Sequence, residues 1–136
     1  MDVIALVGRI LLAAVLVVSG VGHFLSTDAM AEVAASRKLP SPRLAVLAGG
    51  VWNIVAGTMI VLGIWIDLAA LMAVLFLLGA AVLIHNFWAE TEVAAQQAAM
   101  TQFLKDLALA GAGLLLFVLY GEFGDQMGLT ITGPLF

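Results

Sequence analysis

Six polar side chains are the first candidates for chemistry in this chain, because each lies at or near the end of a long apolar run. They are His23, His85, Asn86, Gln102, Lys105 and Asp106. An imidazole can donate or accept a hydrogen bond and can carry a proton near neutral pH. Lysine, carboxylate and amide groups add donors and acceptors for further polar atoms. A cluster of these side chains could therefore bind a lipid head group, a quinone ring or a proton.

The spacing of the last three groups predicts that they share one helical face. Gln102, Lys105 and Asp106 are three and four residues apart, which makes them neighbours on an α-helix. Two interpretations are open. In one, His85 binds Asp106 or Gln102 as a clamp between helices, and Lys105 extends towards the head groups. In the other, the same side chains bind a ligand. The residues by themselves favour the clamp.

No known catalytic or metal-binding motif accompanies this cluster. His23, His85 and Asp106 do not follow H-x-x-E-H or a similar helical spacing, so no metal site is predicted. A nucleophile elbow, a phosphate loop, a haem-attachment motif and a dinucleotide fingerprint are also missing. The chain has no cysteine, which excludes a thiolate zinc site, an iron–sulfur cluster or a dithiol relay within it. Whether the chain is itself an enzyme is left open.

The apolar runs that position the cluster predict a membrane protein. Of 136 residues, 64% are hydrophobic and 10% charged, and the mean hydropathy is +1.18. About 20 apolar helical residues cross a hydrocarbon core of ~30 Å. Four stretches meet this length: Val3–Leu25, Leu44–Trp65, Leu68–Trp88 and Phe103–Tyr120. We expect one all-α domain over residues 1–136, an integral membrane four-helix bundle of two helical hairpins. The acidic start and the length of the first run favour a span over a signal peptide.

The connections between these spans differ in length. Spans two and three meet at a tight turn near Asp67, whereas two long connections lie on the opposite side. The second of them, Ala89–Gln102, predicts a turn or two of helix. The first predicts a short helix over Asp28–Arg37 that lies at the membrane interface. Three of its residues are expected to face lipid: Met30, Val33 and Ala34.

Charges on the connections predict an orientation. Four basic residues lie on or beside the long connections: Arg37, Lys38, Arg43 and Lys105. The positive-inside rule therefore places these connections in the cytoplasm and both termini outside. Arg9 lies on the terminal side, where its expected partners are Asp67 and Glu122. The net charge of −4, without a basic stripe, gives no reason to expect nucleic acid as a partner.

The second span carries small residues on one face. Gly49, Asn53 and Gly57 are four residues apart, a spacing that lets helices approach closely and lets an amide bond across the contact. Helix packing is the favoured interpretation. Trp52, beside this face, either lines a cavity or faces lipid. Glycine-rich spans can pair between chains as well as within one, so a homo-oligomer stays open.

Three stretches carry a family resemblance. They are S-G-V-G-H-F-L at the end of the first span, H-N-F-W at the end of the third, and Q-F-L-K-D-L-A-L at the start of the fourth. In these stretches, and over nearly its whole length, the chain resembles the DoxX family of small four-span bacterial membrane proteins. His23 stands where the family often has lysine, Asn53 where it often has glutamate, and Asp106 where asparagine is common. The missing glutamate weakens any proton path that would need Asn53.

This resemblance implies a multi-pass protein of the bacterial inner membrane that serves as a subunit or membrane partner of an oxidoreductase system. The implied cofactor is quinone, or else lipid, in a pocket between the spans, and the implied partner is a soluble redox protein on the basic connection side. Eight residues are the candidate ligand-binding set. His85, Lys105 and Asp106 would contact the polar head, His23, Asn86 and Gln102 would support them, and Trp52 and Phe87 would flank it.

Two alternatives are retained. One is a non-enzymatic scaffold or stress-response membrane protein whose polar cluster only clamps helices. The other is a small transporter, which is the weakest of the three because transport needs a polar path through the membrane midplane. Only Asn53, Ser19 and Thr58 lie towards that midplane.

Overall fold

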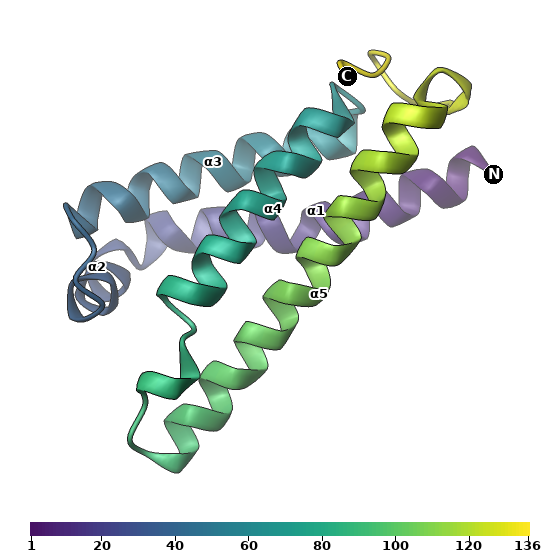
Figure 1. The fold of residues 1–136 in the computed structure, drawn as a ribbon. Helices are drawn as coiled ribbons and strands as arrows, with labels where there is room; N and C mark the ends of the chain where they lie inside the picture. The colour runs from purple at the N-terminus through teal and green to yellow at the C-terminus, as the bar shows by residue number, and fades with distance from the viewer.

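The computed structural model describes residues 1–136 and is almost entirely helical (Figure 1). Four helices are long and apolar enough to cross a membrane: α1 (Asp2–Leu25), α3 (Pro42–Leu62), α4 (Ile66–Leu83) and α5 (Val93–Phe123). The short helix α2 (Thr27–Ser36) joins α1 to α3, and the 3₁₀ turns η1 (Phe87–Ala89) and η2 (Gly124–Gln126) flank α5. The predicted all-α membrane fold is confirmed.

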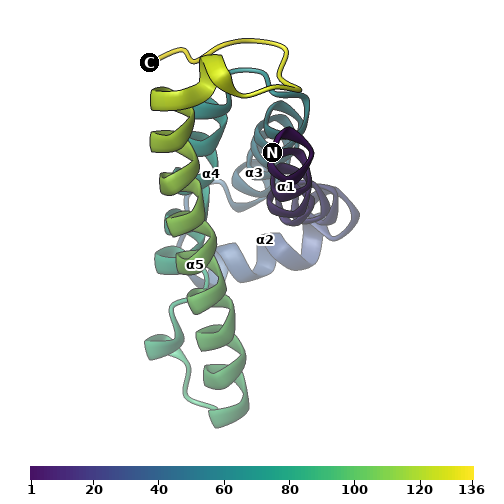
Figure 2. The ribbon, with the colours of Figure 1, turned by 90° about the vertical axis from the view of Figure 1, so that its right-hand side faces the viewer.

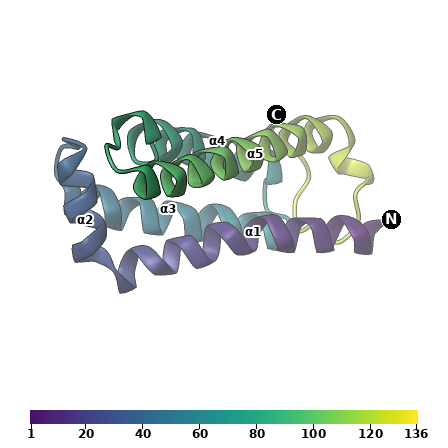
Figure 3. The ribbon, with the colours of Figure 1, turned by 90° about the horizontal axis from the view of Figure 1, so that it is seen from below.

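The long helices form two antiparallel hairpins. α1 packs along α3, α4 packs along α5, and the contact between α3 and α4 joins the two pairs. Figure 2 shows the helices in the order α1, α3, α4, α5 across the molecule, and Figure 3 shows the α1–α3 pair on one side and the α4–α5 pair on the other. Both termini and the α3–α4 turn lie at one end, here the terminal end. Helix α2 and η1 lie at the other, here the connection end (Figure 1).

Small side chains close the bundle towards its terminal end. The core cluster is Ala13, Leu16, Ala56, Ile60, Ala69, Ala73, Leu77 and Ala110. Alanine at such contacts lets helix backbones approach closely, which is a main source of helix association in lipid. Towards the connection end the two hairpins diverge (Figure 1). The polar groups singled out in the sequence lie in this divergent half.

The turn between α3 and α4 begins earlier than hydropathy predicts. Gly63 has φ +73°, a left-handed conformation that glycine adopts without a steric penalty, and it ends α3 at Leu62 rather than at Trp65. Trp65 itself precedes α4, which begins at Ile66. Hydropathy could not place this break because the turn residues are themselves apolar.

The connection between α4 and α5 also corrects the predicted spans. Helix α4 ends at Leu83, so His85 and Asn86 lie beyond it instead of in its last turn. Phe87 then packs edge-to-face on Phe103 of α5, with ring centroids 5.4 Å apart, which turns the chain back. Helix α5 begins at Val93 and has 31 residues. At 1.5 Å per residue it is ~46 Å long and exceeds the hydrocarbon core by several turns.

The short helix predicted over Asp28–Arg37 is present as α2, over Thr27–Ser36, but it does not present the predicted face as a whole. Ala34 is buried, with 2% of its surface exposed, and Met30 and Val33 join it in lining a cavity between the hairpins. Ala34 therefore does not face lipid as expected and Met30 is half-buried, whereas Val33 is 46% exposed. The helix crosses the connection end of the bundle, and its apolar side covers the divergent hairpins instead of the bilayer.

The last residues fold back over the terminal end. Asp67 accepts hydrogen bonds from the backbone N–H groups of Leu135 and Phe136, at 2.6 and 2.8 Å. Arg9 donates to the carbonyl oxygen of Leu129 at 2.6 Å. The expected pairing of Arg9 with Asp67 and Glu122 was wrong, because the returning backbone takes up both groups and Glu122 is exposed. Local hydropathy contains no signal for such a return.

Candidate functional site

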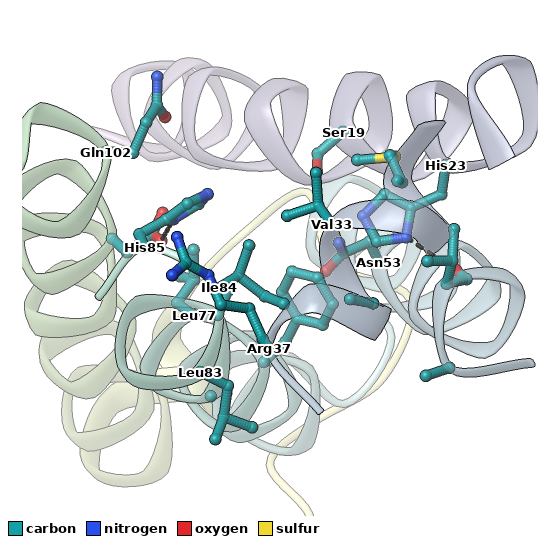
Figure 4. Close-up of a pocket in the computed structure, with 18 of the residues that line it drawn as sticks. Ser19, His23, Val33, Arg37, Asn53, Leu77, Leu83, Ile84, His85 and Gln102 are labelled. Atoms are coloured by element: carbon teal, nitrogen blue, oxygen red, sulfur yellow. Dashed lines mark hydrogen bonds and ion pairs between the residues drawn. The ribbon is translucent and has the colours of Figure 1, made fainter. Parts of the chain in front are cut away.

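A cavity of about 780 Å³ occupies the divergent half of the bundle (Figure 4). All five α-helices contribute to it, and most of the lining side chains are apolar. Apart from Arg37 and Glu90, the polar lining residues fall into two groups, which lie on opposite sides of the space in Figure 4. We call them the His85 cluster (His85, Gln102, Lys105 and Asp106) and the His23 pole (His23, Asn53 and Ser19).

The His85 cluster is a continuous chain of polar contacts. The Nδ1 atom of His85 lies 2.6 Å from Oδ2 of Asp106, and Nζ of Lys105 lies 3.4 Å from Oδ1 of the same carboxylate. Lys105 also donates to Oε1 of Gln102 at 2.6 Å. Because a carboxylate only accepts hydrogen bonds, Nδ1 of His85 carries the proton, which leaves Nε2 for another partner. The structure thus brings together four of the six residues expected to form one polar cluster, whereas His23 bonds to the backbone of Val46 elsewhere and Asn86 does not line the cavity.

Exposure differs sharply within this cluster. The side chain of Asp106 is 3% exposed, whereas those of His85 and Lys105 are 27% and 44% exposed. The buried carboxylate therefore fixes the orientation of the imidazole, and the ring and the ammonium group stay accessible from the cavity. This division of roles is typical of a base held by a buried acid, and it is also compatible with a helix clamp.

An ion pair that the sequence did not suggest closes the same side of the cavity. Arg37, which follows α2, pairs with Glu90, which follows η1, and both line the cavity. The pair joins the two hairpins, and Figure 4 shows the Arg37 side chain beside His85. Arg37 is therefore not part of an open basic face, as its position on a long connection had indicated. Opposite charges on the two connections were the only available signal.

At the His23 pole the imidazole is fixed by the backbone. Nδ1 of His23 lies 2.8 Å from the carbonyl oxygen of Val46, so this nitrogen is the donor and Nε2 stays unpaired. A Cβ atom at Gly49 would lie 3.1 Å from Cε1 of His23, so glycine makes room for the ring. Asn53 is completely buried, and neither amide atom has a hydrogen-bond partner. The expected bond of Asn53 across the helix contact is absent.

Three residues of the sequence-derived set lie outside the cavity lining. Trp52 donates from Nε1 to the carbonyl oxygen of Met72 at 2.8 Å and is 41% exposed, so it bridges α3 and α4 on their outer face. Phe87 packs against Trp88 and Phe103 and shapes the η1 turn. Asn86 follows α4 beside that turn. None of these three residues lines the cavity.

Comparison with known proteins decides the family. The sequence model of the DoxX family matches residues 4–86 of this chain, more than half of its length. The chain belongs to the DoxX family. It is also similar to the inner membrane protein YphA of Escherichia coli (strain K12), with 31% identity over 116 residues, covering 85% of this chain and 82% of that protein. No solved structure matches it.

Membership of the DoxX family and the similarity to YphA agree with the four apolar spans, and together they place the protein in the bacterial inner membrane as a multi-pass protein. The family match ends at Asn86. It therefore includes both histidines but not Lys105 and Asp106, the polar neighbours of His85 on α5.

Proposed function

We propose that this DoxX protein is a subunit or membrane partner of an oxidoreductase system and that its cavity binds the head of a quinone-class amphiphile. One observation carries the proposal: a largely apolar cavity between the hairpins contains the His85 cluster at one side. An apolar chamber with a few convergent polar groups is the usual form of a small-molecule site.

The donor set suits a quinone head. Quinone carbonyl oxygens accept hydrogen bonds, which Lys105 and Arg37 can donate from the cavity wall. A quinol hydroxyl donates a hydrogen bond, which the unpaired Nε2 of His85 can accept. A lipid head group would use the same cationic donors and is the other ligand class that this side of the cavity fits. When bound, a quinone would supply the redox chemistry that side chains alone do not provide.

The proposed redox partner follows from the composition of the chain. A protein without cysteine or a cofactor motif requires electrons from another protein. Two cationic side chains are exposed on the surface of the first long connection. Arg43 pairs with Asp28 at an exposed site, and Lys38 is also exposed. We expect a soluble partner to dock there, in the cytoplasm.

Substitution of His85→Ala tests the ligand site. In mild detergent, decylubiquinone is expected to raise the thermal unfolding midpoint of the wild type, and the variant should lose most of this increase. Without quinone, the variant should unfold at a lower midpoint because it lacks the hydrogen bond to Asp106, so the test compares the quinone-induced increase in each protein. The matched control is Asn86→Ala, whose side chain lies outside the cavity lining and whose response to quinone should be unchanged.

The second candidate function is a membrane scaffold. It is favoured by the observation that the His85–Asp106 and Arg37–Glu90 pairs both hold elements together. In that case decylubiquinone has no specific effect on the unfolding midpoint of either the wild type or the His85→Ala variant. A transporter is not proposed, because the alanine-rich core closes the terminal half of the bundle.

A further inference from the structure

The amide of Asn53 is the least satisfied polar group that faces the cavity. The residue is 0% exposed, and both Oδ1 and Nδ2 lack a hydrogen-bond partner. Buried side-chain amides in folded proteins are almost always hydrogen-bonded, because an unbonded one has lost its hydration without compensation. Asn53 lines the cavity from α3, about two helical turns deeper than Val46. An amide in this position is suited to a partner that enters the cavity.

His23 presents a second unpaired atom to the same space. Its Nδ1 proton is directed to the carbonyl oxygen of Val46, so Nε2 is an acceptor when the ring is neutral. Figure 4 shows His23, Asn53 and Ser19 on one side of the cavity, and His85 with Arg37 on the other. The His23 pole is therefore spatially separate from the His85 cluster.

The His23 pole contains no aspartate, glutamate, lysine or arginine side chain. All four charged residues that line the cavity belong to the other side, either as the Arg37–Glu90 pair or as Lys105 and Asp106 around His85. A carboxylate or phosphate would find no cation at the His23 pole. A hydroxyl group can accept from Nδ2 of Asn53 while it donates to Nε2 of His23, and a carbonyl can accept from the same amide.

We propose that the His23 pole is a second ligand subsite, which binds a neutral hydroxyl or carbonyl group carried on an apolar molecule. It shares its cavity with the proposed quinone site but does not depend on quinone or on redox chemistry. A molecule that uses both sides would have a polar head at the His85 cluster and a second, neutral oxygen at Asn53.

A pair of probes that differ only in a hydroxyl group tests this subsite. Purified full-length protein in mild detergent is titrated with 1-dodecanol or dodecane at equal mole fractions, and thermal unfolding is followed by tryptophan fluorescence. The wild type should be stabilised more by the alcohol than by the alkane. Asn53→Leu, which has a similar shape without the amide, should raise the half-stabilising fraction of alcohol about threefold to tenfold, as expected for one lost hydrogen bond.

Three further measurements make the result decisive. Trp52→Phe, on the outer face of the same helix, should keep the full preference for the alcohol. His85→Ala should keep it too, so failure of the quinone proposal would not remove this effect. Asn53→Ala, which cannot overfill the site, should lose the preference even if Asn53→Leu folds poorly. The proposal is overturned if the wild type does not distinguish the two probes, or if both Asn53 variants still do.

Unfolding without a probe gives an independent check. Because the Asn53 amide bonds to no protein group, Asn53→Leu should unfold at or above the wild-type midpoint. A clear loss of stability in this variant, with the same loss in Asn53→Ala, would assign the amide to the internal structure of the bundle and would contradict a ligand subsite.

Discussion

The two histidines of the cavity are held in the same way at the level of single atoms. Each ring places its Nδ1 proton on a fixed acceptor, which is the Asp106 carboxylate for His85 and the Val46 carbonyl for His23. Each ring therefore has a defined tautomer and an unpaired Nε2. The acceptors differ in charge: Asp106 makes a charge-assisted hydrogen bond with His85, whereas the carbonyl of Val46 makes a neutral one with His23.

A double-mutant cycle measures how strongly the acid holds the ring. His85→Ala and Asp106→Ala are each expected to lower the free energy of unfolding. Together they should lower it by less than the sum, with a coupling of about 1–3 kcal/mol for a hydrogen bond to a charged group. Unfolding by denaturing detergent gives all three values. Glu92 is an exposed carboxylate, so the changes in unfolding free energy caused by Glu92→Ala and His85→Ala should be additive. If the changes caused by Asp106→Ala and His85→Ala are also additive, the His85–Asp106 interaction is contradicted.

The sequence predicted which site residues lie close together only where helical spacing determines their positions. The face formed by Gln102, Lys105 and Asp106, and its approach to His85, follow from the three- and four-residue period and from the level at which the apolar runs end. The Arg37–Glu90 pair joins two connections whose paths depend on tertiary packing. From the sequence, Asn53 was interpreted as a helix-packing residue, because the cavity beside it depends on tertiary structure.

At the scale of helices, the contact between α1 and α3 depends on glycine. A Cβ atom at Gly20 would lie 2.7 Å from Cγ1 of Ile54 and 2.8 Å from the carbonyl oxygen of Gly50. These distances are too short for van der Waals contact, so the two helices approach closely only because the side chain is absent. The close approach also fixes one wall of the cavity, next to His23.

Gly20→Ala should therefore destabilise the bundle, even though alanine favours a helix more than glycine does. Overpacking at a tight contact costs about 1–3 kcal/mol, which outweighs the gain in helix propensity of about 1 kcal/mol. The matched control is Gly22→Ala, where an added Cβ meets nothing within 4 Å and stability should be equal or higher. Thermal unfolding in detergent compares the two; equal midpoints would argue against a close α1–α3 contact.

The presence of the four long helices could be predicted from the sequence, but the residues at which they end could not. Long apolar runs predicted all four spans, because hydrocarbon permits little else than helix. The ends of α3 and α4 depend on Gly63 and on the packing of Phe87 against Phe103. Hydropathy scores these turn residues as membrane residues. A turn or two of helix was predicted within Ala89–Gln102, but its continuity with the fourth span was not, because glutamine and alanine continue a helix after hydropathy has fallen.

At the scale of the whole molecule, the bundle is closed at the terminal end and open at the connection end. The alanine-rich core and the returning C-terminal segment fill the first half, and the cavity occupies the second. A ligand therefore has access from the connection end or between the divergent hairpins. The side of the membrane that this end faces decides where a redox partner can dock.

The orientation can be measured directly because the chain has no cysteine of its own. Gln97→Cys, near the exposed start of α5, and Glu122→Cys, near its end, each add one thiol. If the long connections are cytoplasmic, a membrane-impermeant maleimide should label Glu122→Cys in intact spheroplasts and Gln97→Cys only after lysis. The reverse pattern would place the connection end outside and would exclude a cytoplasmic partner.

The central claim is that this DoxX protein binds a quinone-class amphiphile in its cavity as part of an oxidoreductase system. The most direct measurement is mass spectrometry of the small molecules and proteins that co-purify from native membranes in mild detergent. The proposed function predicts stoichiometric quinone together with a redox protein, and loss of the quinone from the His85→Ala variant. Recovery of bulk phospholipid alone, without a redox partner, would contradict it and would favour the membrane scaffold.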